Sequence, residues 1–200
     1  MVIGTMINVY DNFFNEEDYN FISDYCLKSS YFYGEGNGDP NSPFDPTTCT
    51  GLVHEVYYHT EANRPSECSY QIGGGPVKTL NQKRIFNLFS QSIEKKFPKY
   101  KSTDIIRIYI NCFAKSESSH YHTDAEDNVG TTFLFYPNKK WELNDGGETQ
   151  FFIDDNIYGI IPIPNRMIFF DANLLHKATP FRDRHRFSIA IKYNVQYSSQ

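Results

Sequence analysis

The chain has 200 residues and a formal net charge of −5. This length fits one globular domain with a substantial core, and 17 Phe and 15 Tyr argue against a disordered segment. The acidic balance argues against a protein that holds nucleic acid or an anionic membrane mainly through counterion release.

Cysteine spacing and hydropathy indicate the compartment. Four cysteines, with no C-x-x-C pair among them, are expected to be buried or free thiols: Cys26, Cys49, Cys68 and Cys112. The N-terminus shows no secretory apolar region, and no apolar run is long enough to span a bilayer. We therefore expect a reducing, intracellular location in the cytoplasm and no membrane partner.

The first elements in the chain are a short strand and an amphipathic helix. "MINVY", residues 6–10, favours a strand, and the segment 15–30 favours a helix that Asn15 caps. Four residues recur on one face of this helix: Tyr19, Ile22, Tyr25 and Cys26. This face is expected to pack on a core.

Residues 34–76 carry the turn-rich stretches "GEGNGDPNSPFDP" and "GGGP". Long segments of this composition often form binding loops or lids, so we expect a lid here. A surface excursion with short strands around "TGLVHEVYYH", residues 50–59, is an equal alternative.

A second helix is expected between Pro76, which suits a first helical turn, and Pro98, which ends it. Its apolar face consists of Leu80, Phe86, Leu88, Phe89, Ile93 and Phe97. We expect this face to cover a sheet.

Beyond residue 104 the pattern becomes that of short strands. The expected segments are "DIIRIYINCF", "GTTFLFYP", "ETQFFID", "YGIIPI", "NRMIFFD" and "HRFSIAIKYNV". Turn signals such as "NDGG" and "IPN" separate them. Six short strands without intervening helices predict an antiparallel sandwich or barrel.

A candidate metal site lies in "SHYHTD", residues 119–124. On a strand, residues i and i+2 share a face, so His122 and Asp124 can point at one spot, with His120 beside them. Such a pair alone is weak evidence, because a hydrogen-bonded surface pair has the same pattern. His176, at the end of an apolar segment, is the addition that a barrel could bring to face the pair.

Two imidazoles and one carboxylate form the facial triad of non-haem Fe(II) oxygenases, which leaves coordination positions open. A 2-oxo acid can chelate two of these positions, and O₂ can take the third. The far carboxylate of such a cosubstrate needs a fixed cation, and a guanidinium suits it because it donates paired hydrogen bonds. Arg186 stands ten residues beyond His176.

Taken in order, these features resemble the 2-oxoglutarate and Fe(II)-dependent oxygenases, in particular the prolyl 4-hydroxylase-like branch. The resemblance spans roughly residues 104–193 and rests on "HTD", "GGETQFF", "MIFFDANLLHKATPF" and "RFS". It implies a mainly β (α+β) protein with a double-stranded β-helix, a jelly-roll or cupin-like barrel. In a single domain over 1–200, residues 1–103 would supply helical support and the lid, and 104–195 the barrel.

The resemblance also implies roles for single residues. His122, Asp124 and His176 would bind iron, and Arg186 would pair with the C5 carboxylate of 2-oxoglutarate. Ser188 and Thr149, the latter in "GGET", would line the cosubstrate pocket.

One position departs from the family pattern. Nine residues before the first ligand histidine, where the branch commonly has a tyrosine, this chain has Phe113. Tyr109, in phase with Phe113 on the strand, could compensate, and it equally fits a packed core residue. No chemical role is expected for His54, His59 or His185.

The implied activity is hydroxylation of a C–H bond with Fe(II), 2-oxoglutarate as cosubstrate and O₂, with ascorbate as a candidate reductant. The expected substrate is a prolyl residue in a peptide or protein, because the aromatic residues Tyr31, Phe32, Tyr33 and Phe44 suit an extended chain. A free amino acid or other small metabolite is the alternative, followed by a non-catalytic binding barrel. Nucleic acid is disfavoured, because the demethylase-type arginine pattern is not matched.

Overall fold

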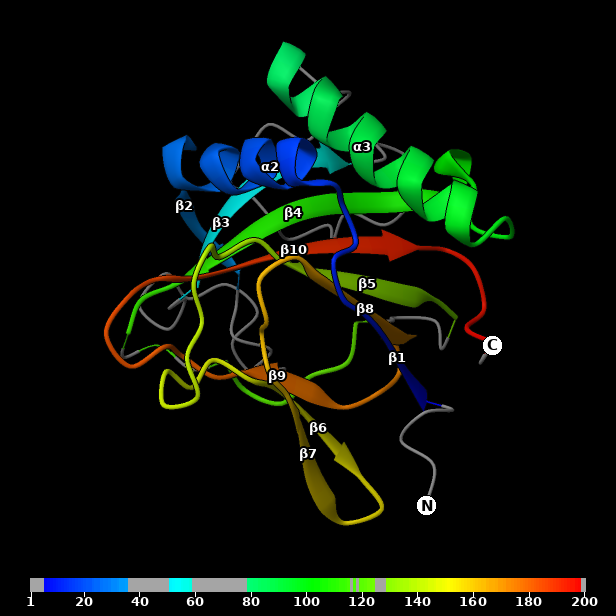
Figure 1. Cartoon of the computed structure of the whole chain (residues 1–200). Coiled ribbons are helices and arrows are strands. Elements are labelled where there is room, and N and C mark those ends of the chain that lie inside the picture. The colour runs from blue at the N-terminus through cyan, green and yellow to red at the C-terminus, as the bar shows by residue number, and fades with distance from the viewer. Residues whose placement is uncertain are drawn as a thin grey trace.

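A computed structural model describes residues 6–35, 51–58, 79–115, 117, 119–124 and 129–198. Two antiparallel sheets make up most of the described structure (Figure 1). The larger sheet has the strand order β1-β8-β5-β10-β4-β3-β2, and the smaller sheet has the order β7-β6-β9.

The strands of the larger sheet are β1 (Ile7–Tyr10), β2 (Phe32–Glu35), β3 (Gly51–Tyr58), β4 (Ile105–Phe113), β5 (Thr131–Tyr136), β8 (Arg166–Asp171) and β10 (Arg186–Tyr193). Those of the smaller sheet are β6 (Thr149–Ile153), β7 (Asn156–Ile160) and β9 (His176–Ala178).

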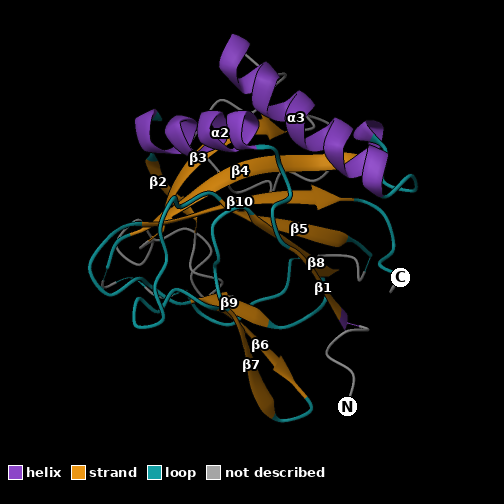
Figure 2. Cartoon of the chain, in the orientation of Figure 1, coloured by secondary structure: helices purple, strands orange, loops and turns teal. Residues whose placement is uncertain are grey.

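Two α-helices lie side by side on one face of the larger sheet, and a 3-10 turn, η1 (Ser102–Asp104), precedes β4 (Figure 2). Helix α2 (Glu16–Lys28) begins as predicted, because the Asn15 side chain accepts a hydrogen bond of 2.9 Å from the backbone N–H of Asp18. Ile22 and Cys26 of its expected apolar face are buried.

Helix α3 (Leu80–Lys96) begins later than predicted. Thr79 is its N-cap and forms a capping box with Gln82, so the expected start at Pro76, which lies outside the described residues, was wrong. Leu80, expected on the apolar face, is 86% exposed, because the first turn extends beyond the sheet-facing core. The buried position at this end of the helix is Ile85.

The two faces of the larger sheet bury different side chains, as the period-2 alternation of a strand requires. On β4, Ile108, Ile110 and Cys112 join the core under the helices. Tyr109 joins the second core, which lies between the two sheets together with residues such as Leu134 and Phe151. This second face is the interior of the barrel (Figure 1).

Strands were found in all six segments predicted beyond residue 104, although β7 ends before "IPI". It forms a hairpin with β6 through Asp154 and Asp155, both at positive φ, and this turn sets where β7 starts and stops. The three-residue strand β9 was not predicted separately, since it is too short to show alternation.

The expected lid cannot be assessed in most of its length, because residues 36–50 and 59–78 lie outside the described residues, as do Cys49 and Cys68. Residues 51–58 belong to the sheet as β3, which pairs with β4, so the alternative of a strand around "TGLVHEVYYH" is confirmed.

Cys26 and Cys112 are buried free thiols, as expected. Within the described parts of the chain, neither helix has the length and apolar character needed to cross a bilayer.

Candidate metal centre

The three residues of the expected triad are brought together by backbone pairing at the end of the smaller sheet. His122 and His176 exchange two backbone hydrogen bonds, each 2.9 Å long, so residue 122 lies directly beside the first residue of β9. Two residues on, the N–H of Asp124 donates to the carbonyl of Ala172 at 2.7 Å. These contacts fix segments that lie more than 45 residues apart in sequence.

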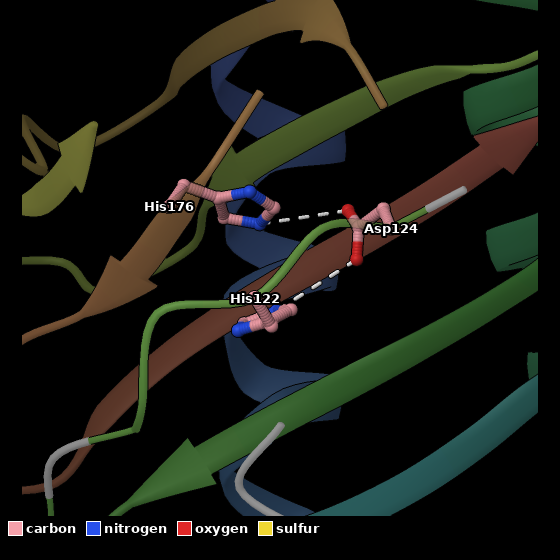
Figure 3. A group of neighbouring side chains, drawn as sticks. All are labelled: His122, Asp124 and His176. Carbon is pink, nitrogen blue, oxygen red and sulfur yellow. Dashed lines mark ion pairs between the residues drawn. The ribbon is translucent and has the colours of Figure 1, made fainter. Parts of the chain in front are cut away.

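The side chains of the triad converge on one point (Figure 3). Their ligand atoms, one from each residue, all lie within 4.8 Å of one another. The Nε2 atoms of His122 and His176 are 3.8 Å and 3.6 Å from the two carboxylate oxygens of Asp124. The His122 side chain is 30% exposed and that of Asp124 4%, so the centre opens on the side of His122.

Hydrogen bonds orient both imidazoles for metal binding. Nδ1 of His122 donates to the carbonyl of His120 at 2.9 Å, and Nδ1 of His176 donates to that of Leu174 at 2.8 Å. A carbonyl only accepts, so Nε2 of each ring carries the lone pair that faces Asp124. Burial lowers the pKa of His176 to about 4, which keeps this ring in the neutral form that a metal requires.

Asp124 is held by two side chains that the sequence interpretation missed. Lys192 Nζ lies 2.5 Å from Oδ1, and the hydroxyl of Thr132 donates to Oδ2 at 2.7 Å. Burial raises the pKa of Asp124, but Lys192 and the two imidazoles outweigh it and hold this pKa well below its usual range. The carboxylate is therefore ionised and fixed in orientation.

Arg186, the expected cosubstrate residue, is fully buried in the same barrel interior. Its guanidinium donates to the carbonyl of Gly147 at 2.8 Å, to the hydroxyl of Thr149 at 2.9 Å and to that of Ser188 at 3.2 Å. Tyr136 completes this polar group, since its hydroxyl donates to that of Thr149 at 2.8 Å. Within the described parts of the chain, no carboxylate forms an ion pair with Arg186, so an anionic ligand fits this position.

Gly147 explains why the "GGET" turn needs its glycines. Its φ is +83°, and a Cβ at this position would lie 2.2 Å from the ring of Phe181. A side chain here would push the backbone away from Phe181 and displace the carbonyl that accepts from Arg186.

The departure at Phe113 is visible in the register. Phe113 pairs with Arg186 across β4 and β10, and the guanidinium carbon lies 5.9 Å from its ring centroid. Tyr109 lies opposite Ala190, with the ammonium of Lys192 5.5 Å from its ring centroid. Its compensating role toward the cosubstrate stays a prediction.

The other histidines that the structure describes, together with Arg184, lie outside this centre. The His120 ring is exposed, and its residue contributes a carbonyl to His122. His54 lies between Tyr25 and the backbone of Ser30, and Arg184 pairs with Asp145. His59 falls outside the described residues.

The sequence does contain a pattern that could have identified the residues not predicted for this site. Lys192 is in phase with Arg186 and Ser188 on β10, so a charged residue at this inward position of an apolar strand marks a partner inside the barrel. Thr132 and Tyr136 share the corresponding phase on β5, where a buried hydroxyl calls for a partner.

Two imidazoles and a carboxylate form a donor set that suits Fe(II), and they fit such an ion in this structure. The family model described as the 2OG-Fe(II) oxygenase superfamily matches residues 108–194. No curated protein matches the chain.

Solved structures of such oxygenases share the fold. A Burkholderia pseudomallei oxidoreductase of the 2OG-Fe(II) oxygenase family has a TM-score of 0.68 at 16% identity, covering 99% of this chain and 89% of its own. A Pseudomonas putida prolyl-4-hydroxylase has a TM-score of 0.65 at 12% identity, covering 95% and 93%. A Trichoplax adhaerens prolyl hydroxylase, in complex with a hypoxia-inducible-factor peptide fragment, has a TM-score of 0.65 at 15% identity, covering 95% and 84%.

The double-stranded β-helix expected from the sequence is thus confirmed, and so is the resemblance. Residues 108–194, which match the model of the 2OG-Fe(II) oxygenase superfamily, contain the His-Asp-His group and Arg186.

Proposed function

We propose that this protein is an Fe(II)- and 2-oxoglutarate-dependent hydroxylase, with His122, Asp124 and His176 as its iron ligands. The observation that carries the proposal is the convergence of the three ligand atoms within 4.8 Å of one another. The proposal also accounts for Arg186, a buried cation without an ion-pair partner among the described residues, because 2-oxoglutarate would supply the carboxylate.

In such a site, different residues of the chain would bind the metal, orient its ligands and bind the cosubstrate. His122, Asp124 and His176 would hold the metal with two imidazole nitrogens and one carboxylate, a donor set that suits Fe(II). Lys192 and Thr132 fix the carboxylate of Asp124, and the carbonyls of His120 and Leu174 fix the two rings. Arg186, assisted by Ser188, Thr149 and Tyr109, binds and orients the cosubstrate.

When bound, Fe(II) couples the O₂-dependent decarboxylation of 2-oxoglutarate to succinate and CO₂ with hydroxylation of a C–H bond. The apolar side chains of the barrel interior, such as Phe151 and Phe170, limit water around this chemistry. Ascorbate would serve as the reductant that returns the metal to Fe(II).

The proposed substrate is a prolyl residue in a peptide or protein. The support is the likeness in fold to two prolyl hydroxylases, one from Pseudomonas putida and one from Trichoplax adhaerens. The second of these structures contains a bound peptide fragment. A small molecule is the second candidate, because a Streptomyces hygroscopicus protein with the same fold (TM-score 0.60, 9% identity) binds hygromycin B. Fold likeness constrains the reaction more than the substrate.

The metal assignment is tested with Mn(II) as a redox-inert substitute for Fe(II). In His176→Ala, Mn(II) affinity measured by electron paramagnetic resonance should fall at least about tenfold, because one of three protein ligands is lost. His120→Ala is the matched control and should bind Mn(II) as the wild type does. Equal affinity in His176→Ala and wild type would contradict the assignment.

The substrate is tested by incubating the Fe(II)-loaded protein with 2-oxoglutarate and either a proline-rich peptide library or free amino acids. Mass spectrometry should show a gain of one oxygen on proline within peptides. Succinate release with free amino acids but never with peptides would instead support the small-molecule alternative.

A further inference from the structure

Asn111 carries a buried polar atom that the fold does not use. Its Oδ1 is inaccessible to solvent and has no hydrogen-bond partner, one of three such side-chain atoms among the described residues. The residue as a whole is nonetheless partly exposed. Asn111 lies on β4, which is hydrogen-bonded to β10 on one side and to β3 on the other, so this exposure does not come from a sheet edge.

The strand phase places Asn111 on the inner face of the barrel. Its neighbours Ile110 and Cys112 are buried under the helices, and Tyr109, two residues away, belongs to the core between the sheets. The side chain of Asn111 therefore faces the interior in which the triad and Arg186 lie.

The register makes Arg186 a diagonal neighbour of Asn111 across β4 and β10. Asn111 pairs with Ser188 across β4 and β10, and the next inward pair along these strands is Phe113 with Arg186. The Ser188 hydroxyl accepts from Arg186 at 3.2 Å. Asn111 thus stands next to the position where the family pattern would have a tyrosine and this chain has Phe113.

An unpaired buried oxygen costs stability, so an apolar residue at this position would serve the empty barrel better. Polar groups that a fold leaves unsatisfied are concentrated at functional sites. A carboxylate bound by Arg186 would accept a hydrogen bond from the Asn111 amide, since Nδ2 is a donor and is not among the buried unpaired atoms.

We propose that Asn111 is a positioning residue for the cosubstrate, whose side-chain amide donates to the 2-oxoglutarate carboxylate held by Arg186 and takes the place of the tyrosine absent at position 113. This inference rests on the proposed function, since it assumes that Arg186 binds 2-oxoglutarate.

The test measures 2-oxoglutarate affinity by calorimetry in the Mn(II)-loaded protein, together with urea unfolding of the metal-free protein. Asn111→Val should weaken 2-oxoglutarate about tenfold or more, the loss expected for one hydrogen bond to a charged group. Its urea midpoint should not fall, because an unpaired polar atom is removed. Asn111→Asp should bind 2-oxoglutarate more weakly still, because it sets a second carboxylate against the first.

Ser23→Ala is the matched control. Ser23, on α2, is also buried, but its hydroxyl already donates to the carbonyl of Pro137 at 2.7 Å. Its loss should lower the urea midpoint and leave 2-oxoglutarate affinity unchanged.

Arg186→Ala, measured in parallel, separates the two claims. If Arg186→Ala abolishes binding while Asn111→Val binds as the wild type, the role of Asn111 is overturned and the proposed function stands. If Arg186→Ala also binds 2-oxoglutarate normally, the cosubstrate site itself is wrong.

Discussion

At the scale of single residues, one buried ion pair stabilises the metal centre when the metal is absent. Asp124 is ionised inside the barrel, and Lys192, itself only 7% exposed in its side chain, is its cationic partner at 2.5 Å. A buried carboxylate without a partner is costly, so this pair stabilises the empty site.

Lys192→Met should therefore lower the free energy of unfolding of the metal-free protein by about 3 kcal/mol, because it leaves a buried charge unpaired. Urea denaturation measures this loss. Lys139→Met is the control, since the ion pair of Lys139 with Asp24 is 45% exposed on both sides and solvent screens it. Equal losses in the two variants would show that Lys192 does not carry the charge balance of Asp124.

At the scale of elements, α2 is fixed to the larger sheet by a histidine. His54 of β3 donates through Nδ1 to the carbonyl of Ser30 and accepts through Nε2 from the hydroxyl of Tyr25, both at 2.8 Å. Both ring nitrogens are satisfied in this neutral form, and burial lowers the pKa of His54 below its ordinary value of 6.5.

This depressed pKa predicts a pH dependence. Below the ordinary histidine pKa the unfolded chain binds a proton that the folded state does not, so the contribution of His54 to stability is present above that pH and lost as pH falls toward the folded pKa. In His54→Gln, urea unfolding should show a smaller loss of stability between about pH 7.5 and pH 5.5 than in the wild type. Parallel pH profiles would mean that His54 is protonated equally in both states.

At the scale of the whole molecule, the metal centre joins segments that are distant in sequence. His122 and Asp124 lie between β4 and β5, whereas His176 begins β9 of the smaller sheet. An ion that binds only the folded arrangement stabilises it by mass action.

Mn(II) at about 100 times its dissociation constant should thus raise the free energy of unfolding by about 2.7 kcal/mol. Urea denaturation with and without Mn(II) measures this increment, and the wild type with Mg(II), which prefers oxygen ligands, is the control. A protein with no Mn(II)-dependent increment would lack a site that depends on the fold.

The sequence alone determined the features that depend on local pattern. Alternating apolar residues identified the strands, and Asn15 identified the start of α2. The strand expected through His122 and Asp124 is only an isolated bridge at His122, so the backbone pairing of the folded chain, not strand alternation, brings these two side chains together. The start of α3 was not determined in this way, because both Pro76 and Thr79 are acceptable helix starters and only packing against the sheet selects between them.

Only the tertiary structure decided which distant side chains meet. It set His176 beside His122 through backbone pairing, gave Asp124 the buried partners Lys192 and Thr132, and left the Asn111 oxygen without a donor. The type of a residue limits the chemistry of its side chain, and its position in a strand determines the face of the sheet on which the side chain lies. The register between strands decides what lies opposite it, and that register is fixed by turns and packing over the whole barrel.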